Sequence, residues 1–146
     1  MIAAGTLLGF DFGAKRIGVA VGETVTGIAN PLGAIEAAAN DARFAAIERL
    51  VSEWRPAGRV VGRPRHADGS PHEVARLAEK FARRLAARHK LPVAFVDETL
   101  TSATAEAQLR EMGARGGRKA DVDALAAAII LQSYLDAPDA HETLAS

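Results

Sequence analysis

Cysteine is absent from this chain of 146 residues. Its absence excludes disulfide bonds, thiolate metal sites and cysteine nucleophiles, and it fits a reducing compartment. Long hydrophobic runs are absent too, because no window approaches the roughly 20 apolar residues that a membrane-spanning helix needs. The first five residues lack both the basic start and the apolar stretch of a secretory signal. We therefore expect a cytoplasmic protein with no membrane partner.

Net charge is also lacking, because 18 Lys and Arg balance 18 Asp and Glu. A chain of zero formal charge does not hold nucleic acid by bulk attraction, so a nucleic-acid role needs local clusters of basic residues. Such clusters exist, although each alone is more typical of an ordinary solvated surface. The candidate contacts to a nucleic-acid backbone are Lys15, Arg16, Arg63, Arg65, Arg115, Arg118 and Lys119.

The length and the hydrophobic fraction of 49% are enough for one domain with a core of its own. No linker, internal repeat or low-complexity tract interrupts the chain. We expect a single domain over residues 5–136 and a flexible C-terminal tail over 137–146.

Hydrophobic patterning predicts an α/β fold. The expected strands are Leu7–Asp11, Ile17–Val21, Ala29–Ile35, Arg59–Gly62 and Pro92–Val96, and the expected helices are Ala42–Trp54, Ser70–Arg88, Ser102–Met112 and Val122–Leu135. The first three strands should form an antiparallel meander, and the two later strands, reached through helices, should run parallel. The sequence thus predicts a five-stranded mixed sheet flanked by helices.

Local signals refine this prediction. Pro31 indicates that the third strand is an edge strand or carries a bulge. Asn40 or Asp41 can cap the first helix. The second helix has a complete capping box, with Ser70 as the N-cap, Pro71 at the first helical position and Glu73 completing the box.

Three acids stand where elements are predicted to end or begin. Asp11 follows the first strand, Glu98 follows the last strand, and Asp123 begins the final helix. Sites in open α/β sheets form beyond the carboxyl ends of the parallel strands. Carboxylates crowded together repel one another unless a cation neutralises them, and oxygen-only ligands favour Mg²⁺ or Mn²⁺. A pair of such ions promotes phosphodiester cleavage.

Each acid also has a structural interpretation. Asp11 could form a turn, and Glu98 could end a strand and cap the next helix. Asp121 and Asp123 could be first-turn acids that the helix dipole favours, with Asp121 the better capping candidate. Thr101 could cap a helix or hydrogen-bond a phosphate. The placement of the three acids together is what favours a metal site.

Four segments resemble the motifs of the YqgF family, whose members are described as Holliday junction resolvases and as nucleases of small-subunit ribosomal RNA precursors. The matching segments are Gly9–Ala20, Val60–Pro64 with Asp68–Ser70, Val96–Ser102 and Asp123–Gln132. They occur in the family's order and cover nearly the whole chain. Thr99 stands where many members have arginine, and Arg63 and Arg65 replace residues that are often apolar or neutral.

The resemblance implies a ribonuclease H-like fold and an acidic Mg²⁺ or Mn²⁺ site at Asp11, Glu98 and Asp123. It also implies a nuclease that acts in ribosome biogenesis on the 5′ end of the 16S ribosomal RNA precursor, with the ribosome or its precursor as a partner. Neutral net charge favours structured RNA over a long DNA duplex.

Three alternatives stay open. A Holliday junction resolvase would need a symmetric dimer, and no dimer face is identifiable from the sequence. A non-catalytic ribosome-assembly factor would bind RNA without cutting it. An ATPase or sugar kinase would share the Asp-x-Gly hairpin that begins at Asp11, but such enzymes need two domains of this kind around the nucleotide.

Overall fold

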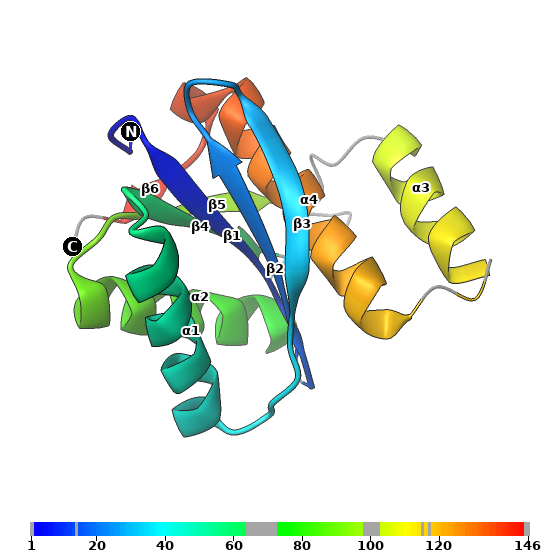
Figure 1. Cartoon of the computed structure of the whole chain (residues 1–146), viewed down its shortest axis with the longest axis horizontal. Helices are drawn as coiled ribbons and strands as arrows, with labels where there is room; N and C mark the ends of the chain where they lie inside the picture. The colour runs from blue at the N-terminus through cyan, green and yellow to red at the C-terminus, as the bar shows by residue number, and fades with distance from the viewer. Residues whose placement is uncertain are drawn as a thin grey trace.

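The computed structural model of the protein describes residues 2–13, 15–63, 73–97, 103–114, 116 and 118–144, with only the backbone described for 103–106 and 109. The elements, in chain order, are β1 (Thr6–Phe12), β2 (Ile17–Glu23), β3 (Ile28–Ile35), α1 (Asn40–Trp54), β4 (Gly58–Arg63), α2 (Glu73–His89), β5 (Val93–Asp97), α3 (Ala103–Ala114), α4 (Lys119–Asp136), the 3₁₀ turn η2 (Pro138–Ala140) and β6 (Thr143–Leu144). Figure 1 shows their arrangement.

One mixed sheet runs through the molecule in the order β3-β2-β1-β4-β5-β6. The antiparallel meander β1-β2-β3 and the parallel pairs β1–β4 and β4–β5 confirm the predicted topology. The prediction for Pro31 is also confirmed. Strand β3 lies at the sheet edge, and its register with β2 shifts between Val19 and Ala20, opposite Pro31.

The sheet has a sixth strand that the sequence did not predict. Strand β6 pairs antiparallel with β5, and the Phe95 amide donates to the Glu142 carbonyl at 2.8 Å. The sheet therefore has six strands and not the five expected, and residues 138–140 and 143–144 of the expected tail form a 3₁₀ turn and a strand. A strand of two residues is too short to carry a hydrophobic pattern, so nothing in the sequence distinguishes it from a loop.

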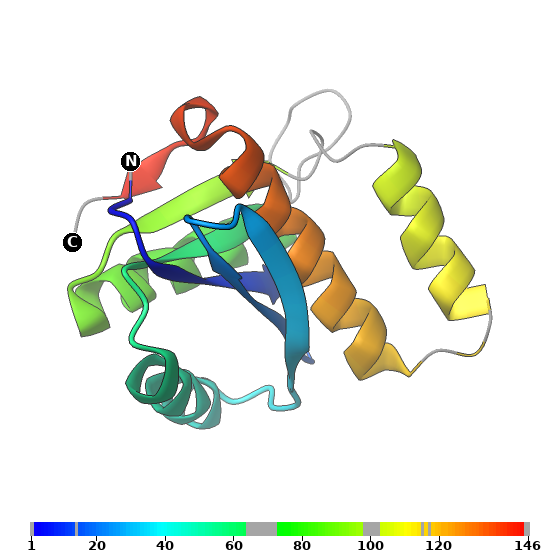
Figure 2. The same ribbon diagram turned by 45° about the horizontal axis from the view of Figure 1, so that its top comes forward.

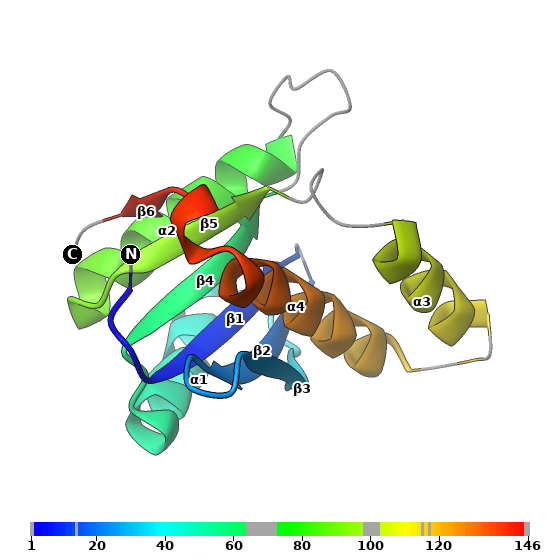
Figure 3. The ribbon, with the colours of Figure 1, turned by 90° about the horizontal axis from the view of Figure 1, so that it is seen from above.

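Two apolar cores lie on opposite faces of the sheet. One core, under α1 and α2, is built around Phe10, Phe44 and Phe81. The other, under α4, is built around Leu7, Leu131 and Tyr134. Figure 3 shows α4 crossing one face while α1 and α2 cover the other. The strand positions alternate between the two cores, as period-two geometry requires.

Helix α4 lies close against the sheet because small residues face it. A Cβ atom added to Gly9 of β1 would lie 2.8 Å from Cβ of Leu131. The helix itself buries Ala124, Ala127 and Ala128. Protein interiors are close-packed, so these small residues determine the distance between α4 and strands β1 and β2.

The structure corrects two predicted helix starts. The N-cap of α1 is Ala39, without a side-chain hydrogen bond, so Asn40 and Asp41 lie inside the first turn and do not cap. Helix α4 begins at Lys119 rather than Val122, because the favourable helix formers Lys119 and Ala120 extend it.

Asp121 consequently lies in the first turn of α4, where it accepts a hydrogen bond from Arg118, and is not a cap. The predicted capping box at Ser70 and Pro71 lies outside the described residues.

Helix α3 stands away from the sheet, beside α4, in Figures 1 and 2. The residues of its last two turns whose side chains are described are mostly exposed. Among the described helices, none combines the length and apolarity that a bilayer crossing needs.

Candidate active site

Asp11 is a half-buried residue on the α4 face of the sheet, near the carboxyl end of β1. Leu7 and Gly9, four and two residues earlier, face α4, whereas Leu8 and Phe10 join the core under α1 and α2. The alternation of the strand therefore turns Asp11 away from that larger core and toward the α4 side. An aspartate that served only to form a turn would not need to face the α4 side of the sheet.

Asp123 reaches the same place from α4. A Cβ atom added to Gly18 of β2 would lie 2.0 Å from the backbone oxygen of Asp123. Gly18 is the cross-strand partner of Asp11, and directly paired residues of antiparallel strands face the same side of the sheet. The structure thus brings Asp11 and Asp123 together around Gly18, although Asp123 lies in the second turn of α4 and not at its start.

Arg16 holds Asp123 directly. Its Nε donates to Oδ2 of Asp123 at 2.7 Å, and both side chains are 26% exposed. A guanidinium beside a carboxylate forms a strong, charge-assisted hydrogen bond. No described residue hydrogen-bonds Oδ1 of Asp123, so this oxygen remains for another ligand, and the partial exposure of the pair leaves it open to solvent.

Three other predicted basic residues are exposed. Lys15 lies in the β1–β2 turn, Arg118 precedes α4 and Lys119 begins it. Arg118 also forms a weak ion pair with Asp121 at 3.3 Å. The Arg16–Asp123 pair joins the β1–β2 turn to α4. The three cations therefore lie in or beside the elements that carry Asp11 and Asp123.

Four of the predicted site residues, Arg65, Glu98, Thr101 and Arg115, lie outside the described residues. Within the described part of the chain, no group of three or more His, Asp and Glu side chains could hold a metal ion. Of the predicted triad the structure describes Asp11 and Asp123, and the role of all three acids as metal ligands stays a prediction.

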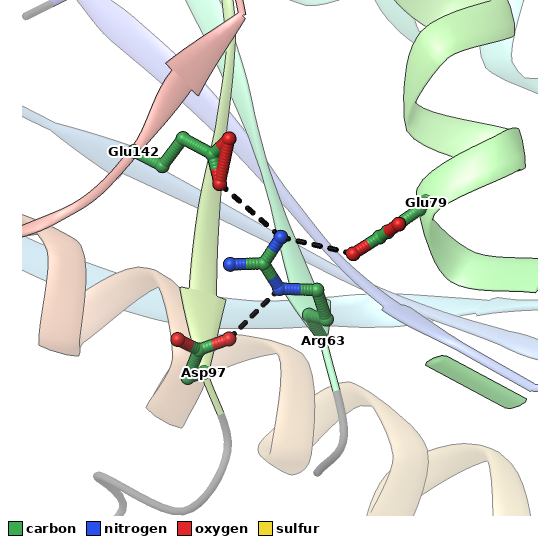
Figure 4. A network of polar contacts seen from close by, with 4 residues as sticks. All are labelled: Arg63, Glu79, Asp97 and Glu142. Atoms are coloured by element: carbon green, nitrogen blue, oxygen red, sulfur yellow. Dashed lines mark hydrogen bonds and ion pairs between the residues drawn. The ribbon is translucent and has the colours of Figure 1, made fainter. Parts of the chain in front are cut away.

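Arg63 occupies a different environment from the other predicted basic residues. It is 8% exposed and pairs with Asp97, Glu79 and Glu142 (Figure 4). Asp97 thereby lies on the α2 face of the sheet, opposite Asp11. One oxygen of Asp97, Oδ1, pairs with Arg63 at 2.8 Å, and whether Asp97 shares a site with Glu98 stays a prediction because Glu98 lies outside the described residues.

Arg43 of α1 is a supporting residue that the sequence did not indicate. It is 3% exposed, its Nη2 donates to the Gly13 carbonyl at 2.6 Å, and its guanidinium lies 5.3 Å from the Phe12 ring centroid. Burial lowers the pKa of Arg43. This residue fixes the turn that follows Asp11. The one signal for Arg43 in the sequence is its position on the inward face of the predicted helix, where the other residues are apolar.

The arrangement suits a hard divalent cation. Asp11 and Asp123 offer carboxylate oxygens from one face, and such ligands bind Mg²⁺ and Mn²⁺. The described residues near them add no sulfur or imidazole ligand that would favour zinc. Arg16 supplies positive charge to the pair, which limits the repulsion between the two carboxylates.

Solved structures define the class of fold. A chain of Thermus thermophilus RuvC in complex with a Holliday junction substrate superposes with a TM-score of 0.57, at 18% identity over 95% of this chain and 99% of that chain. A second T. thermophilus RuvC structure gives 0.58 at 17% identity, with the same coverage. The protein therefore has the ribonuclease H-like fold of RuvC, and the predicted fold class is confirmed.

Sequence comparison defines the family. The RuvX family, described as Holliday junction resolvase, matches residues 5–137. A protein of Dechloromonas aromatica is 57% identical over 136 residues, covering 92% of each chain, and one of Thiobacillus denitrificans is 54% identical over 134 residues, covering 91% of this chain and 92% of the relative. Both are named "Putative pre-16S rRNA nuclease". The chain belongs to the RuvX family, which is the YqgF family predicted from its motifs.

Proposed function

We propose that this protein is a metal-dependent nuclease that hydrolyses phosphodiester bonds of the 16S ribosomal RNA precursor. The names of relatives at 54% and 57% identity support this substrate. The RuvX family and the RuvC-like fold support phosphodiester hydrolysis as the reaction. The observation that carries the proposal is that the backbone of Asp123 packs on Gly18, the cross-strand partner of Asp11.

Asp11, Asp123 and Glu98 would hold Mg²⁺ or Mn²⁺. Glu98 is included as the third ligand on the strength of the family motif Val96–Ser102, and it lies outside the described residues. When bound, such ions supply Lewis-acid activation of water and stabilise the leaving oxygen.

The chain's own residues would orient the substrate. Arg16 fixes one oxygen of Asp123 and so directs the other toward the ion. Lys15, Arg118 and Lys119 are exposed cations on the elements that carry the acids, so they would bind backbone phosphates on either side of the scissile bond. Such contacts position the substrate without reading its sequence.

A second candidate substrate is a four-way DNA junction. The description of the RuvX family and the RuvC complex with a Holliday junction support it. The zero net charge of the chain argues against this substrate, because binding along a long DNA duplex depends on many positive charges. We therefore place the RNA precursor first.

Cleavage of an end-labelled precursor fragment beside a four-way junction tests the proposal. Each substrate is incubated with Mg²⁺, with Mn²⁺ and with chelator, using wild type, an Asp11→Asn/Asp123→Asn variant and an Asp139→Asn control. Asp139 is an exposed acid in η2, so its variant makes the same Asp→Asn change once, at a position outside the site.

We expect metal-dependent cleavage of the RNA by wild type and by the control, and loss of cleavage in the double variant. Cleavage of the junction alone would replace the RNA substrate with a DNA one. Absence of any cleavage by folded wild-type protein would overturn the nuclease proposal in favour of a non-catalytic assembly factor.

A further inference from the structure

Helix α2 concentrates positive charge in a chain whose net charge is zero. Residues 73–90 contain six lysines and arginines and only two glutamates, whereas the whole chain has 18 residues of each sign. The remainder of the chain is therefore net negative. All six cations are exposed, and they are Arg76, Lys80, Arg83, Arg84, Arg88 and Lys90.

Four of these cations form a stripe along one face of α2. Arg76, Lys80 and Arg84 follow one another at intervals of four residues, and Arg83 is three residues from Lys80. Such intervals put side chains on the same side of a helix, about 6 Å apart along its axis. The four residues are called the basic stripe below. They border a shallow hollow that is lined by Arg76, Glu79, Lys80, Arg83, Arg84 and Ala87.

The two glutamates of α2 leave most of the basic stripe without a counter-charge. Oε1 of Glu79 lies 3.0 Å from Nη1 of the buried Arg63, so this carboxylate already has a partner under the helix. Glu73 contacts Arg76 at 3.4 Å, in a pair exposed enough to contribute little. Within the described part of the chain, no ion pair or hydrogen bond engages the side chains of the other three stripe residues.

The basic stripe brings no benefit to the fold. Like charges four residues apart destabilise a helix, and the stripe contains two such pairs, Arg76 with Lys80 and Lys80 with Arg84. Arg88 differs from the stripe residues, because its guanidinium lies over the Phe44 ring at 4.3 Å and so takes part in packing. A local pattern that costs stability without a compensating contact in the fold indicates a role outside the fold.

The chemistry of the stripe matches the phosphates of a nucleic-acid duplex. Three of its four residues are arginines, whose planar guanidinium binds phosphate with two parallel hydrogen bonds. Proteins that bind single strands stack the bases on aromatic side chains, but the one phenylalanine of α2, Phe81, is 5% exposed and belongs to the core. A surface that offers cations without exposed aromatic rings suits the backbone of a paired stem.

The stripe lies across the sheet from the candidate active site. Helix α2 covers the face opposite α4 (Figure 3). The contact between Glu79 and Arg63 places the first half of α2 beside the carboxyl end of β4. Strands β1 and β4 run parallel, with Phe10 opposite Val61, so Asp11 lies at the same edge of the sheet. A structured RNA that passes around this edge can contact both surfaces, whereas a short fragment at the acids cannot.

We propose that the basic stripe of α2 is a second RNA-binding surface, which binds backbone phosphates of a paired stem in the precursor. The identity of the RNA rests on the proposed function, whereas the phosphate contacts rest on the residues of α2. The stripe makes no contact with the scissile phosphate. It therefore contributes affinity for large structured RNA and does not contribute to the chemical step.

The test compares Lys80→Gln/Arg84→Gln with Arg49→Gln/Arg55→Gln. Arg49 and Arg55 are exposed residues of α1 and its C-cap, on the same face of the sheet, so the control removes the same charge outside the stripe. Lys80→Arg/Arg84→Lys keeps both charges and is the conservative variant. The probe is an RNA duplex of about 16 base pairs, a length that one small domain can span. Its Kd is measured with chelator present, at several salt concentrations.

For Lys80→Gln/Arg84→Gln we expect a Kd roughly tenfold to hundredfold weaker at about 0.1 M salt, because two phosphate contacts are lost. The slope of log Kd against log salt should fall by about 1.4 to 1.8. The control and the conservative variant should keep the slope of wild type. The Tm of the stripe variant should equal or exceed that of wild type, because repulsion along the helix is relieved.

Two results would overturn the proposal. An unchanged slope in the stripe variant would leave an acidic protein surface as the partner of α2. A lower slope with a four-way DNA junction but not with the RNA duplex would assign the stripe to DNA. If the stripe variant does not fold, as judged by circular dichroism, Arg83→Gln carries the test, with an expected change of slope of about 0.7 to 0.9.

The failure of this inference and that of the proposed function are distinguishable. The duplex-binding assay contains no divalent metal, so stripe-dependent binding by a wild-type protein that cleaves nothing would refute the nuclease and keep the second surface. Conversely, cleavage of a short single-stranded fragment should show the same kcat and KM in wild type and in Lys80→Gln/Arg84→Gln. A loss of kcat on that fragment would place the stripe at the active site and overturn the inference.

Discussion

Gly18 lies directly against the backbone of Asp123, so closely that a single added carbon would come within 2.0 Å of the carbonyl oxygen. The same Gly18 is the cross-strand partner of Asp11. One residue without a side chain therefore lets the helix that carries one acid settle onto the strand pair that carries the other. The close packing of α4 on the sheet is therefore what places Asp123 at the candidate site.

Gly18→Ala should damage both stability and activity. The new methyl group would clash with the backbone of Asp123. Backbone cannot rotate away as a flexible side chain could, so α4 must shift. Overpacking of this kind costs about 1–3 kcal/mol in the free energy of unfolding, and displacement of Asp123 should lower kcat about a hundredfold. Urea denaturation and the RNA cleavage assay measure the two effects.

Gly33→Ala is the matched control for this substitution. Gly33 also lies in a strand, on β3, but a Cβ atom there would meet no described atom within 4 Å. We expect its stability and kcat to stay close to those of wild type. An equal loss of stability and kcat in both variants would mean that replacing any strand glycine has this effect. The packing of α4 against Gly18 would then not be the cause.

Arg16→Gln should weaken RNA binding more than it weakens the fold. The Arg16–Asp123 pair is partly exposed, and exposed ion pairs stabilise by only about 0–1 kcal/mol. If Arg16 also contacts phosphate, the slope of log Kd against log salt falls by about 0.7 to 0.9. Binding titrations at several salt concentrations measure it.

Arg49→Gln supplies the comparison, since Arg49 is an exposed arginine on α1, across the sheet from Asp123. An identical change of slope in both variants would contradict a specific role for Arg16.

Divalent metal should stabilise the wild-type protein. A ligand that binds only the folded state raises its stability by about 2.7 kcal/mol at a hundredfold excess over Kd. We expect Mn²⁺ to raise the Tm of wild type and chelator to reverse the rise. Asp11→Asn should abolish this response in differential scanning calorimetry. A full Tm response in that variant would place the ion elsewhere in the protein.

Acid should weaken the fold through His89. Burial and the nearby charge of Arg59 lower the pKa of His89, and Nη1 of Arg59 lies 2.8 Å from its Nδ1. Arginine can only donate, so this ring nitrogen accepts and the folded state favours neutral imidazole. The unfolded chain binds a proton first, so the stabilising contribution is complete above about pH 6.5 and is lost as the pH falls toward the lowered pKa.

Unfolding by urea at pH 7.5 and at pH 5.5 measures this contribution. The difference in unfolding free energy between the two pH values should be smaller in His89→Gln than in wild type. An unchanged difference would show that other groups cause the acid sensitivity.

Much of the fold was predictable because it depends on local pattern. Period-two runs identified five of the six strands, and Pro31 marked the edge strand, because proline cannot donate to a ladder. Helix α4 was found but its start was placed three residues late, since the sequence signal came from acids and not from the helix formers Lys119 and Ala120. Boundaries depend on small energies that tertiary packing overrides.

The site was predictable in part for the same reason. Asp11 interrupts an apolar strand, so its departure from the pattern marks it as a candidate in the sequence alone. Arg63 gives no such signal. As a basic residue beside a loop it matched the pattern of a phosphate contact, and only the folded chain brings Asp97, Glu79 and Glu142 to it from positions 34, 16 and 79 residues away.

The sequence by itself determined the order of elements, the absence of thiol chemistry, the family motifs and the candidate acids, because each is encoded in neighbouring residues. The tertiary structure decided which of these residues meet. Gly18 beneath Asp123, Arg16 on its carboxylate, and Arg63 among three acids all join distant parts of the chain. Such contacts depend on how closely helices and strands pack, and no local pattern encodes that distance.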